Sequence, residues 1–392
     1  MALIRIPSLH VSHSLLLLVV AASCSGIKMP HVPRSTESDW PMFGRTPHRT
    51  NATDELVAPP LTIAWEGDLS SSMGYGSPVV VDTFVFVTNM RGELFVFNAL
   101  TGKRYGWISL GDAFHGSPVI DGAVVYAASA DARESLVAYD LFEAKTLWKR
   151  DYGDIEVTPL FFDNKLYFGT TAGIFYCVEK YKGEKEWSYR LPENRRWKGI
   201  RSSAALFDGT VIFGAEDGNV YALDAKNGRE RWTYDTGAPI FASPTVYNGT
   251  VFIGNFAGTF VALDAQSGTP RWRFPTGASI YAAASFAGNL VLIGNTAGKL
   301  FALSTTEGSI RWSIEFNSVI NSSAVVSGPV AYVGTLKKEL IAVKVQDGTI
   351  VWRQTLNGRV KTTPAVARGR LFVATDDRMV LALEPMQHTE QR

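Results

Sequence analysis

The sequence predicts an all-β chain folded as an eight-bladed β-propeller with four-stranded antiparallel blades, closed by an N-terminal strand. The segment YALDAKNGRERWTYDTG at 221–237 returns forty residues later as VALDAQSGTPRWRFPTG at 261–277, with Asp, Gly and Trp kept. Tryptophans recur at intervals of 39 to 45 residues, a period typical of propeller blades. They are Trp65, Trp107, Trp148, Trp187, Trp232, Trp272, Trp312 and Trp352.

One repeat unit contains four short strands separated by Gly or Asn-Gly turns. They are expected in SPTVYNG (243–249), TVFIGNF (250–256), GTFVALD (258–264) and TPRWRF (269–274). The second and third of these strands have too few polar positions for a sheet with one solvent-exposed face. We therefore expect them to be buried on both sides, between neighbouring blades.

The residues kept in each repeat have mechanical roles. Gly228 and Gly268 supply the positive φ of a tight hairpin, and Asp224 and Asp264 bond backbone N–H groups in it. Each repeat tryptophan is expected to dock between blades as a flat plate, burying on the order of 200 Å². Blade 2 departs from the pattern, because Ala144 stands where Gly is expected.

Eight inner strands are expected, beginning near 77, 117, 158, 202, 243, 282, 322 and 363. The last unit ends without an outer Trp strand, whereas LTIAWEG at 61–67 is a spare strand before the first blade. Pairing of this strand with the end of the chain would complete the eighth blade and cover exposed strand edges. Seven blades with decoration is the alternative.

The N-terminus resembles a bacterial lipoprotein signal. Arg5 precedes a short apolar run at 15–22, and small residues lead into Cys24. This resemblance implies a signal peptide at 1–23, lipid attachment at Cys24 and, with Ser25 following, an outer-membrane destination; an ordinary signal peptide containing a Cys is the alternative. A tether at 24–60, a propeller at 61–386 and a tail at 387–392 would follow. Cys177, in an apolar stretch, is expected to be a buried structural residue.

Composition and motifs exclude several functions. The 392 residues carry 38 Lys and Arg against 37 Asp and Glu, so no global charge favours binding to nucleic acid. No paired-His zinc signature, phosphate loop or Gly-x-Ser-x-Gly elbow is present. No catalytic residue is therefore predicted.

The repeat resembles the tryptophan-docking repeat of PQQ-type propellers over about 61–385, and DWPMFGRTPHRT (39–50) resembles the segment that precedes the ring in many members. This family includes quinoprotein dehydrogenases and the BamB outer-membrane assembly lipoproteins, which the chain resembles most. A dehydrogenase would imply PQQ and Ca²⁺ in the central funnel. This chain has no adjacent Cys pair to cover such a cofactor, and its segments between blades are short.

A basic loop, YRLPENRRWKGIRSS at 189–203, interrupts the longest interval. Its Arg and Trp side chains are types enriched in binding hot spots. The candidate partner-binding residues are Arg195, Arg196, Trp197, Lys198 and Arg201. The loop resembles the docking loop of BamB, although APIFASP (238–244) lacks the acidic residues that accompany it there. A solvated basic loop is the alternative.

A second set of candidates is expected at the mouth of the central funnel, two residues before each inner strand. The set is Tyr75, His115, Glu156, Arg201, Phe241, Ile280, Ile320 and Lys361. These residues could bind a small anion or a peptide. Alternatively, they could form ion pairs with one another around a water-filled channel.

The sequence thus predicts a lipid-anchored, periplasmic, monomeric propeller that acts as a non-catalytic scaffold for protein partners, such as the outer-membrane β-barrel assembly machinery. It predicts no resident metal or cofactor. A PQQ- and Ca²⁺-binding oxidoreductase and a sensor that binds a small ligand in the funnel are the alternatives.

Overall fold

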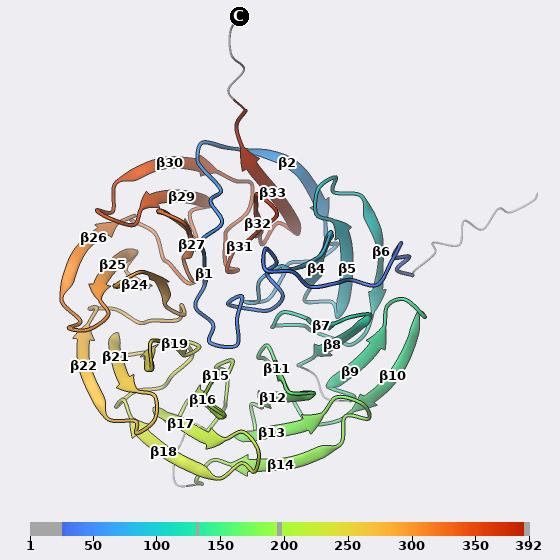
Figure 1. Cartoon of the computed structure of the whole chain (residues 1–392), viewed down its shortest axis with the longest axis horizontal. Coiled ribbons are helices and arrows are strands. Elements are labelled where there is room, and N and C mark those ends of the chain that lie inside the picture. Colours follow the sequence, from blue (N-terminus) through green and yellow to red (C-terminus); the bar gives the residue numbers. More distant parts are fainter. Residues whose placement is uncertain (1–25, 131–132, 194–197, 388–392) are drawn as a thin grey trace, which may run out of the picture.

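A computed structural model describes residues 26–130, 133–193 and 198–387. These residues form eight sheets arranged as a ring, which confirms the predicted fold (Figure 1). Blade 1 comprises β3–β6, and the following blades comprise β7–β10, β11–β14, β15–β18, β19–β22, β23–β26 and β27–β30. Blade 8 contains β31–β33 and takes its fourth strand, β2, from the N-terminal part of the chain.

Strands at equivalent positions have nearly equal lengths. The inner strands are β3 (Val79–Val81), β7 (Val119–Asp121), β11 (Leu160–Phe162), β15 (Ala205–Phe207), β19 (Thr245–Tyr247), β23 (Ser285–Ala287), β27 (Val325–Ser327) and β31 (Ala365–Ala367). The second strands are β4 (Phe84–Thr88), β8 (Val124–Ala128), β12 (Lys165–Gly169), β16 (Thr210–Gly214), β20 (Thr250–Gly254), β24 (Leu290–Gly294), β28 (Val330–Gly334) and β32 (Arg370–Ala374). The third strands are β5 (Glu93–Asn98), β9 (Leu136–Asp140), β13 (Ile174–Glu179), β17 (Asn219–Asp224), β21 (Thr259–Asp264), β25 (Lys299–Ser304), β29 (Glu339–Lys344) and β33 (Met379–Pro385). The outer strands are β6 (Arg104–Ser109), β10 (Lys145–Arg150), β14 (Lys185–Arg190), β18 (Glu230–Asp235), β22 (Pro270–Pro275), β26 (Ile310–Glu315), β30 (Ile350–Thr355) and β2 (Leu61–Asp68).

The second and third strands form the packed layer of each blade. Every residue of β20 is buried, and the four central residues of β21 are buried as well. A side chain on either face of these strands meets a neighbouring blade, so both faces are apolar. The strands therefore lack the alternation of polar and apolar residues that is typical of a sheet with one solvent-exposed face.

At six of the eight junctions in the described ring, a tryptophan ties one blade to the next. In each case the indole N–H donates to a carbonyl oxygen in the hairpin tip between the third and fourth strands of the following blade. The pairs are Trp65–Ala99 (3.0 Å), Trp148–Lys180 (2.9 Å), Trp187–Ala225 (3.1 Å), Trp232–Ala265 (3.1 Å), Trp272–Thr305 (3.0 Å) and Trp312–Val345 (2.7 Å). A glycine in the tip lies against the ring: a Cβ at Gly268 would be 2.6 Å from Trp232. The tip glycine is therefore required by contact as well as by its positive φ.

Trp107 departs from the prediction that it docks against blade 2. The pairing of β5 with β6 puts Gly106, not Trp107, opposite Val96, at the position that Trp272 holds opposite Ala262 in blade 5. The main chain of Gly26 fills the space beside Gly106, where a Cβ would be 2.1 Å from the Gly26 oxygen. Trp107 is thus one residue out of frame, and the N-terminal chain packs where its ring was expected.

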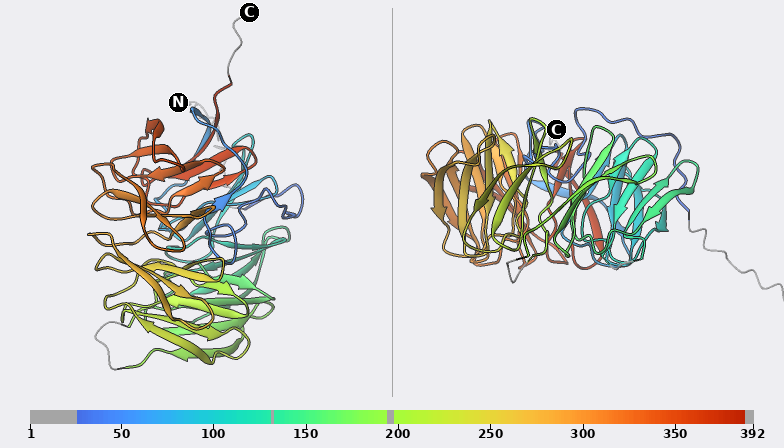
Figure 2. Two further views of the ribbon diagram at one scale, coloured as in Figure 1. Left: turned by 60° about the vertical axis from the view of Figure 1, so that its left-hand side comes forward. Right: turned by 90° about the horizontal axis from the view of Figure 1, so that it is seen from below.

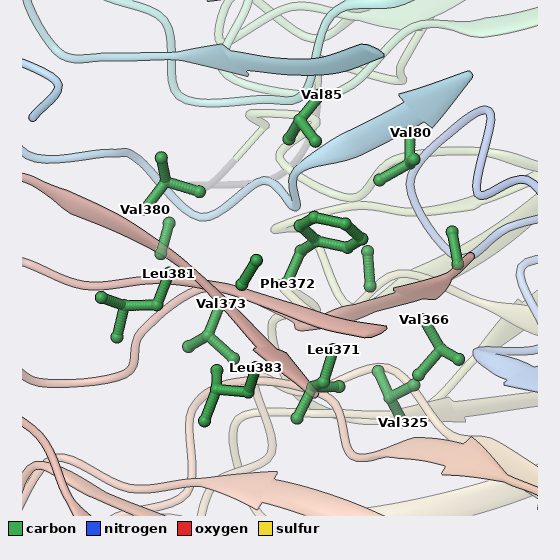
Figure 3. Close-up of a cluster of buried hydrophobic side chains, with 14 of the residues drawn as sticks. Val80, Val85, Val325, Val366, Leu371, Phe372, Val373, Val380, Leu381 and Leu383 are labelled. Carbon is green, nitrogen blue, oxygen red and sulfur yellow. The ribbon is translucent and has the colours of Figure 1, made fainter. Parts of the chain in front are cut away.

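Trp352 occupies the docking position, opposite Ala342, but the following blade has no hairpin tip to receive it. Blade 8 lacks this tip because β33 pairs with β2, with Leu61 opposite Pro385 and Asp68 opposite Met379. A buried cluster spans this closure, from Val325 in blade 7 through Phe372 in blade 8 to Val85 in blade 1 (Figure 3). The predicted N-terminal closure of the ring is therefore confirmed.

Residues 39–57, which we call the plug segment, cross one face of the ring over the central channel (Figures 1 and 2). Backbone N–H groups of the inner strands donate to its carbonyls: Leu206 to Pro47, Val246 to His48 and Val326 to Asn51. β1 (Ala52–Thr53), within this segment, pairs in parallel with β27. The plug segment therefore covers inner strand edges that would otherwise be bare.

Arg49 holds the plug segment at the axis of the ring. Its side chain is fully buried and donates to the carbonyl oxygens of Phe43 (2.8 Å), Thr158 (3.4 Å) and Ala204. Burial lowers the pKa of Arg49 to about 9. Three carbonyl dipoles, from the plug and from blades 3 and 4, take the place of water around this cation.

Cys177 is buried in β13 as a free thiol, as expected, and burial raises its pKa to about 12. A thiol in this state is not a nucleophile at neutral pH. Within the described ranges, no helix is long and apolar enough to cross a membrane.

Candidate functional site

The plug segment converts the central channel into a well with one closed end. The well has a volume of about 740 Å³, and Phe43 of the plug segment lines it. The plug bonds to the middle residues of inner strands, whereas the residues that line the well precede those strands. We call the side with the opening the mouth face and the side with the plug segment the plug face. A concave site of this volume is in the range that binds small ligands.

A ring of hydroxyl groups surrounds the axis at the start of the inner strands. The first backbone N–H of one blade donates to the Ser or Thr side chain of the next, forty to forty-five residues further on. The pairs are Ser77–Ser117 (2.7 Å), Ser117–Thr158 (2.8 Å), Thr158–Ser203 (3.0 Å), Ser203–Ser243 (3.0 Å), Ala283–Ser323 (3.0 Å) and Ser323–Thr363 (3.3 Å). These bonds satisfy backbone donors that would otherwise be unpaired inside the ring.

Aromatic side chains form two opposed walls at the mouth. Tyr75 and His115, from blades 1 and 2, stack with ring centroids 6.5 Å apart. Across the axis, Phe241 and Tyr281, from blades 5 and 6, stack at 5.6 Å, and the edge of Phe256 meets Phe241. Burial raises the pKa of Tyr281, and the Tyr75 phenol contributes in the same direction.

Charged side chains lie between the aromatic walls. Arg201 contacts the carboxylates of Glu156 (3.2 Å) and Glu216 (3.3 Å) on one side of the well. Beyond the lining of the well, Asp376 contacts Arg359 and, at 3.7 Å, Lys361. In the wall of the well, the Glu156 carboxylate is therefore offset by the Arg201 guanidinium.

The predicted position at the mouth is wrong for two residues of the set. Ile280 and Ile320 are buried in the core, and Tyr281 and Asn321, one position later, line the well instead. The errors arose in blade 6, where AAASF offers no Ser to mark the first residue of the strand, and in blade 7, where Ser323 and not the predicted Ser322 is that residue. A spacing of forty residues from Ser243 through Ala283 to Ser323 would have found the register. Tyr75, His115, Glu156, Arg201 and Phe241 line the well, whereas Lys361 lies beyond its lining.

Two polar atoms in the wall of the well have no hydrogen-bond partner within the described part of the chain. They are Oδ1 of Asn321 and Oγ of Ser322, both on blade 7 and both shielded from solvent. Buried polar groups are normally paired, so these atoms are candidates to accept hydrogen bonds from a ligand. Sequence patterns gave no sign of this feature.

The predicted partner-binding loop falls largely outside the described residues. Arg195, Arg196 and Trp197 are not described, and neither is Cys24. Lys198 is exposed beside the gap. Arg201, the last member of the set, belongs to the wall of the well through its contacts with Glu156 and Glu216. The loop therefore ends at the mouth face.

The residues of the well do not fit a PQQ–Ca²⁺ centre. Among the described residues, no group of three or more His, Cys, Asp or Glu could hold a metal ion. Glu156, the carboxylate nearest such a role, faces the Arg201 guanidinium, and the inner hydroxyls already accept backbone N–H bonds. A hard cation would need several free oxygen ligands at one point.

The repeat, the docking tryptophans and the closed ring define a PQQ-type eight-bladed propeller. A family model described as outer membrane protein assembly factor BamB matches residues 60–201, 192–324 and 315–389. Since these matches cover most of the chain, the protein belongs to the BamB family. No curated protein matches the sequence.

Solved structures of two kinds share the fold. BamB from Moraxella catarrhalis aligns with a TM-score of 0.70 at 20% identity, covering 83% of this chain and 99% of that one. Quinohemoprotein alcohol dehydrogenases from Pseudomonas putida HK5 and Comamonas testosteroni align with TM-scores of 0.72 and 0.73, each at 15% identity. Each alignment covers 91% of this chain and 82% of the dehydrogenase. At these identities the likeness shows the fold alone.

Proposed function

We propose that the protein is a non-catalytic scaffold of the bacterial cell envelope, anchored by a lipid at Cys24, that supports outer-membrane protein assembly through protein contacts. The observation that carries this proposal is the family match, which extends over 60–389. A rigid ring suits this role because its loops hold fixed positions for docking other chains.

An oxidoreductase is the second candidate, and its support is the likeness to two alcohol dehydrogenases. The lining of the well argues against it, because the Glu156 carboxylate is paired with Arg201. Incubation with PQQ and Ca²⁺, followed by assays of dye-linked alcohol and sugar oxidation, separates the two candidates. Turnover would favour the enzyme.

Crosslinking in native membranes, followed by purification and mass spectrometry of the captured chains, tests the scaffold directly. We expect recovery of the outer-membrane β-barrel assembly machinery. Its absence, together with a quinone bound to the purified protein, would contradict the proposal.

The basic loop at 189–203 is the proposed contact with this partner. Trp197→Ala combined with Arg196→Ala should reduce crosslinked partner by about tenfold, because Trp and Arg anchor most interface energy. Lys226→Ala with Arg229→Ala, in the blade 4 hairpin tip on the plug face, is the matched control and should retain full capture. Both variants should keep the melting temperature, and equal capture by both would exclude the loop.

A further inference from the structure

The outer hairpin tips of the plug face divide the ring into two halves. Four consecutive blades carry a large exposed apolar side chain after the third strand: Leu100, Phe142 and Tyr181 in the hairpin tips of blades 1, 2 and 3, and Met386 after β33 in blade 8, which has no tip. Their exposed fractions are 51%, 50%, 51% and 69%. The other four blades place exposed polar residues there: Lys226, Gln266, Thr306 and Gln346. We call the four apolar positions the apolar arc.

Single exposed apolar residues are common on protein surfaces, so their arrangement is the informative feature. Leu100, Phe142 and Tyr181 repeat at one hairpin position on adjacent blades, and Met386 follows the equivalent third strand of blade 8. Val32 and Phe162 add exposed apolar surface on the same half, where Val32 lies over the Gly122 turn. On the other half, exposed Ile310 and Ile350 begin the outer strands and do not occupy the tips.

The described chain begins against the outer strand of blade 1, one of the blades of the apolar arc. The backbone of Lys28 donates to Tyr105 in β6 (3.0 Å), and Ile27 is buried in the cluster formed by blades 1 and 2. Gly26 therefore lies at the outer edge of blade 1. Cys24 precedes it by two residues, a reach of at most about 7 Å. A lipid on Cys24 would hold this part of the ring close to a membrane.

Basic side chains stand beside the apolar tips. Lys103, Arg104, Lys145 and Lys182 are exposed next to Leu100, Phe142 and Tyr181, with Glu143 and Glu184 among them. Apolar side chains that enter the lipid interface, flanked by cations that meet phosphate groups, are the pattern of peripheral membrane contact.

We propose that the apolar arc rests on a lipid surface, so that the plug face lies toward the membrane and the mouth of the well opens away from it. This inference rests on the proposed lipid anchor. In this orientation, the mouth face and the basic loop at 189–203 are available to bind protein partners.

A photo-crosslinking experiment on the full chain tests the contact. Benzoylphenylalanine replaces Phe142 in one variant and Gln266 in a matched control on the polar half. Both are bound to vesicles of phosphatidylethanolamine and phosphatidylglycerol, irradiated and analysed for lipid adducts. We expect about tenfold more adduct at 142 than at 266. Equal adducts, no adduct at 142, or failure of the chain to float with the vesicles would overturn the proposal.

A second experiment distinguishes lipid from protein occupants. The same variants are irradiated in native membranes, where adducts at 142 should contain lipid. Adducts to another protein, or to a second copy of this chain, would mean that the arc is a protein interface. Leu100→Gln with Phe142→Gln should also lower salt-resistant membrane association several-fold, whereas Gln266→Ala with Thr306→Ala should not. Partner capture is measured separately, so failure of the scaffold role would be seen independently.

Discussion

Replacement of the Gly268 tip by alanine tests the contact that joins one blade to the next. Gly268 has φ of +71°, and a Cβ there would lie 2.6 Å from the Trp232 ring. Gly277 is the matched control, because it has φ of +85° and no atom within 4 Å of its Cβ position. Both substitutions carry backbone strain of about 1 kcal/mol, but only Gly268→Ala collides with the indole.

The extra cost at Gly268 follows from the geometry. Overpacking a tight contact costs roughly 1–3 kcal/mol. Displacement of Trp232 also weakens its 3.1 Å bond to Ala265, worth about 1 kcal/mol. We therefore expect Gly268→Ala to lower the free energy of unfolding by about 3 kcal/mol and Gly277→Ala by about 1 kcal/mol.

Urea denaturation followed by tryptophan fluorescence measures both variants. Hydrogen exchange of β17, β18, β21 and β22 shows whether the loss is local to blades 4 and 5. A Trp232→Phe background should reduce the cost of Gly268→Ala, because the smaller ring leaves room for the Cβ. Equal destabilisation by the two alanines would refute the docking argument, since backbone strain alone would then account for both.

Three further predictions concern the plug, the hydroxyl ring and acid stability. Arg49→Met should cost about 3 kcal/mol or more, because three carbonyl groups lose a buried donor, and exchange across 39–57 should rise; unchanged exchange would contradict this. Ser203→Ala should lower the free energy of unfolding by about 1–2 kcal/mol, because the Thr158 N–H loses its acceptor. An unchanged midpoint of urea denaturation would contradict the stabilising role of the hydroxyl ring. The Arg271 side chain, with hairpin N–H groups, lowers the pKa of Asp264 to about 2. Its stabilisation is complete above the unfolded pKa of about 3.9 and is lost as pH falls through about 2, so the stability gap between wild type and Asp264→Asn should close over that range; a constant gap would exclude the linkage.

The fold was predictable because its signals are local and repeated. Each hairpin needs its own glycine and each blade contact needs its own indole, so Gly268 and Trp232 have counterparts at a fixed spacing. The spare strand at 61–67 was identifiable because the last unit lacks an outer strand. Such periodic patterns report the contacts that every blade makes.

Features that occur once were not predictable in this way. Trp107 fits the tryptophan spacing. The pairing of β5 with β6 is nevertheless shifted by one residue relative to the other blades, so Gly106 occupies the docking position. Nothing periodic indicates that Arg49 reaches carbonyls in blades 3 and 4, more than a hundred residues away. The lining of the well was mispredicted in blade 6 for a similar reason. Ala283 stands where other blades have the Ser or Thr that marks the start of the inner strand.

Calorimetric titration of the purified full chain against the purified barrel protein of the outer-membrane assembly machinery tests the central claim most directly. The scaffold proposal predicts saturable binding that is weakened by Trp197→Ala with Arg196→Ala and unaffected by Lys226→Ala with Arg229→Ala. A titration without saturable heat, or one in which the two variants behave alike, would contradict it.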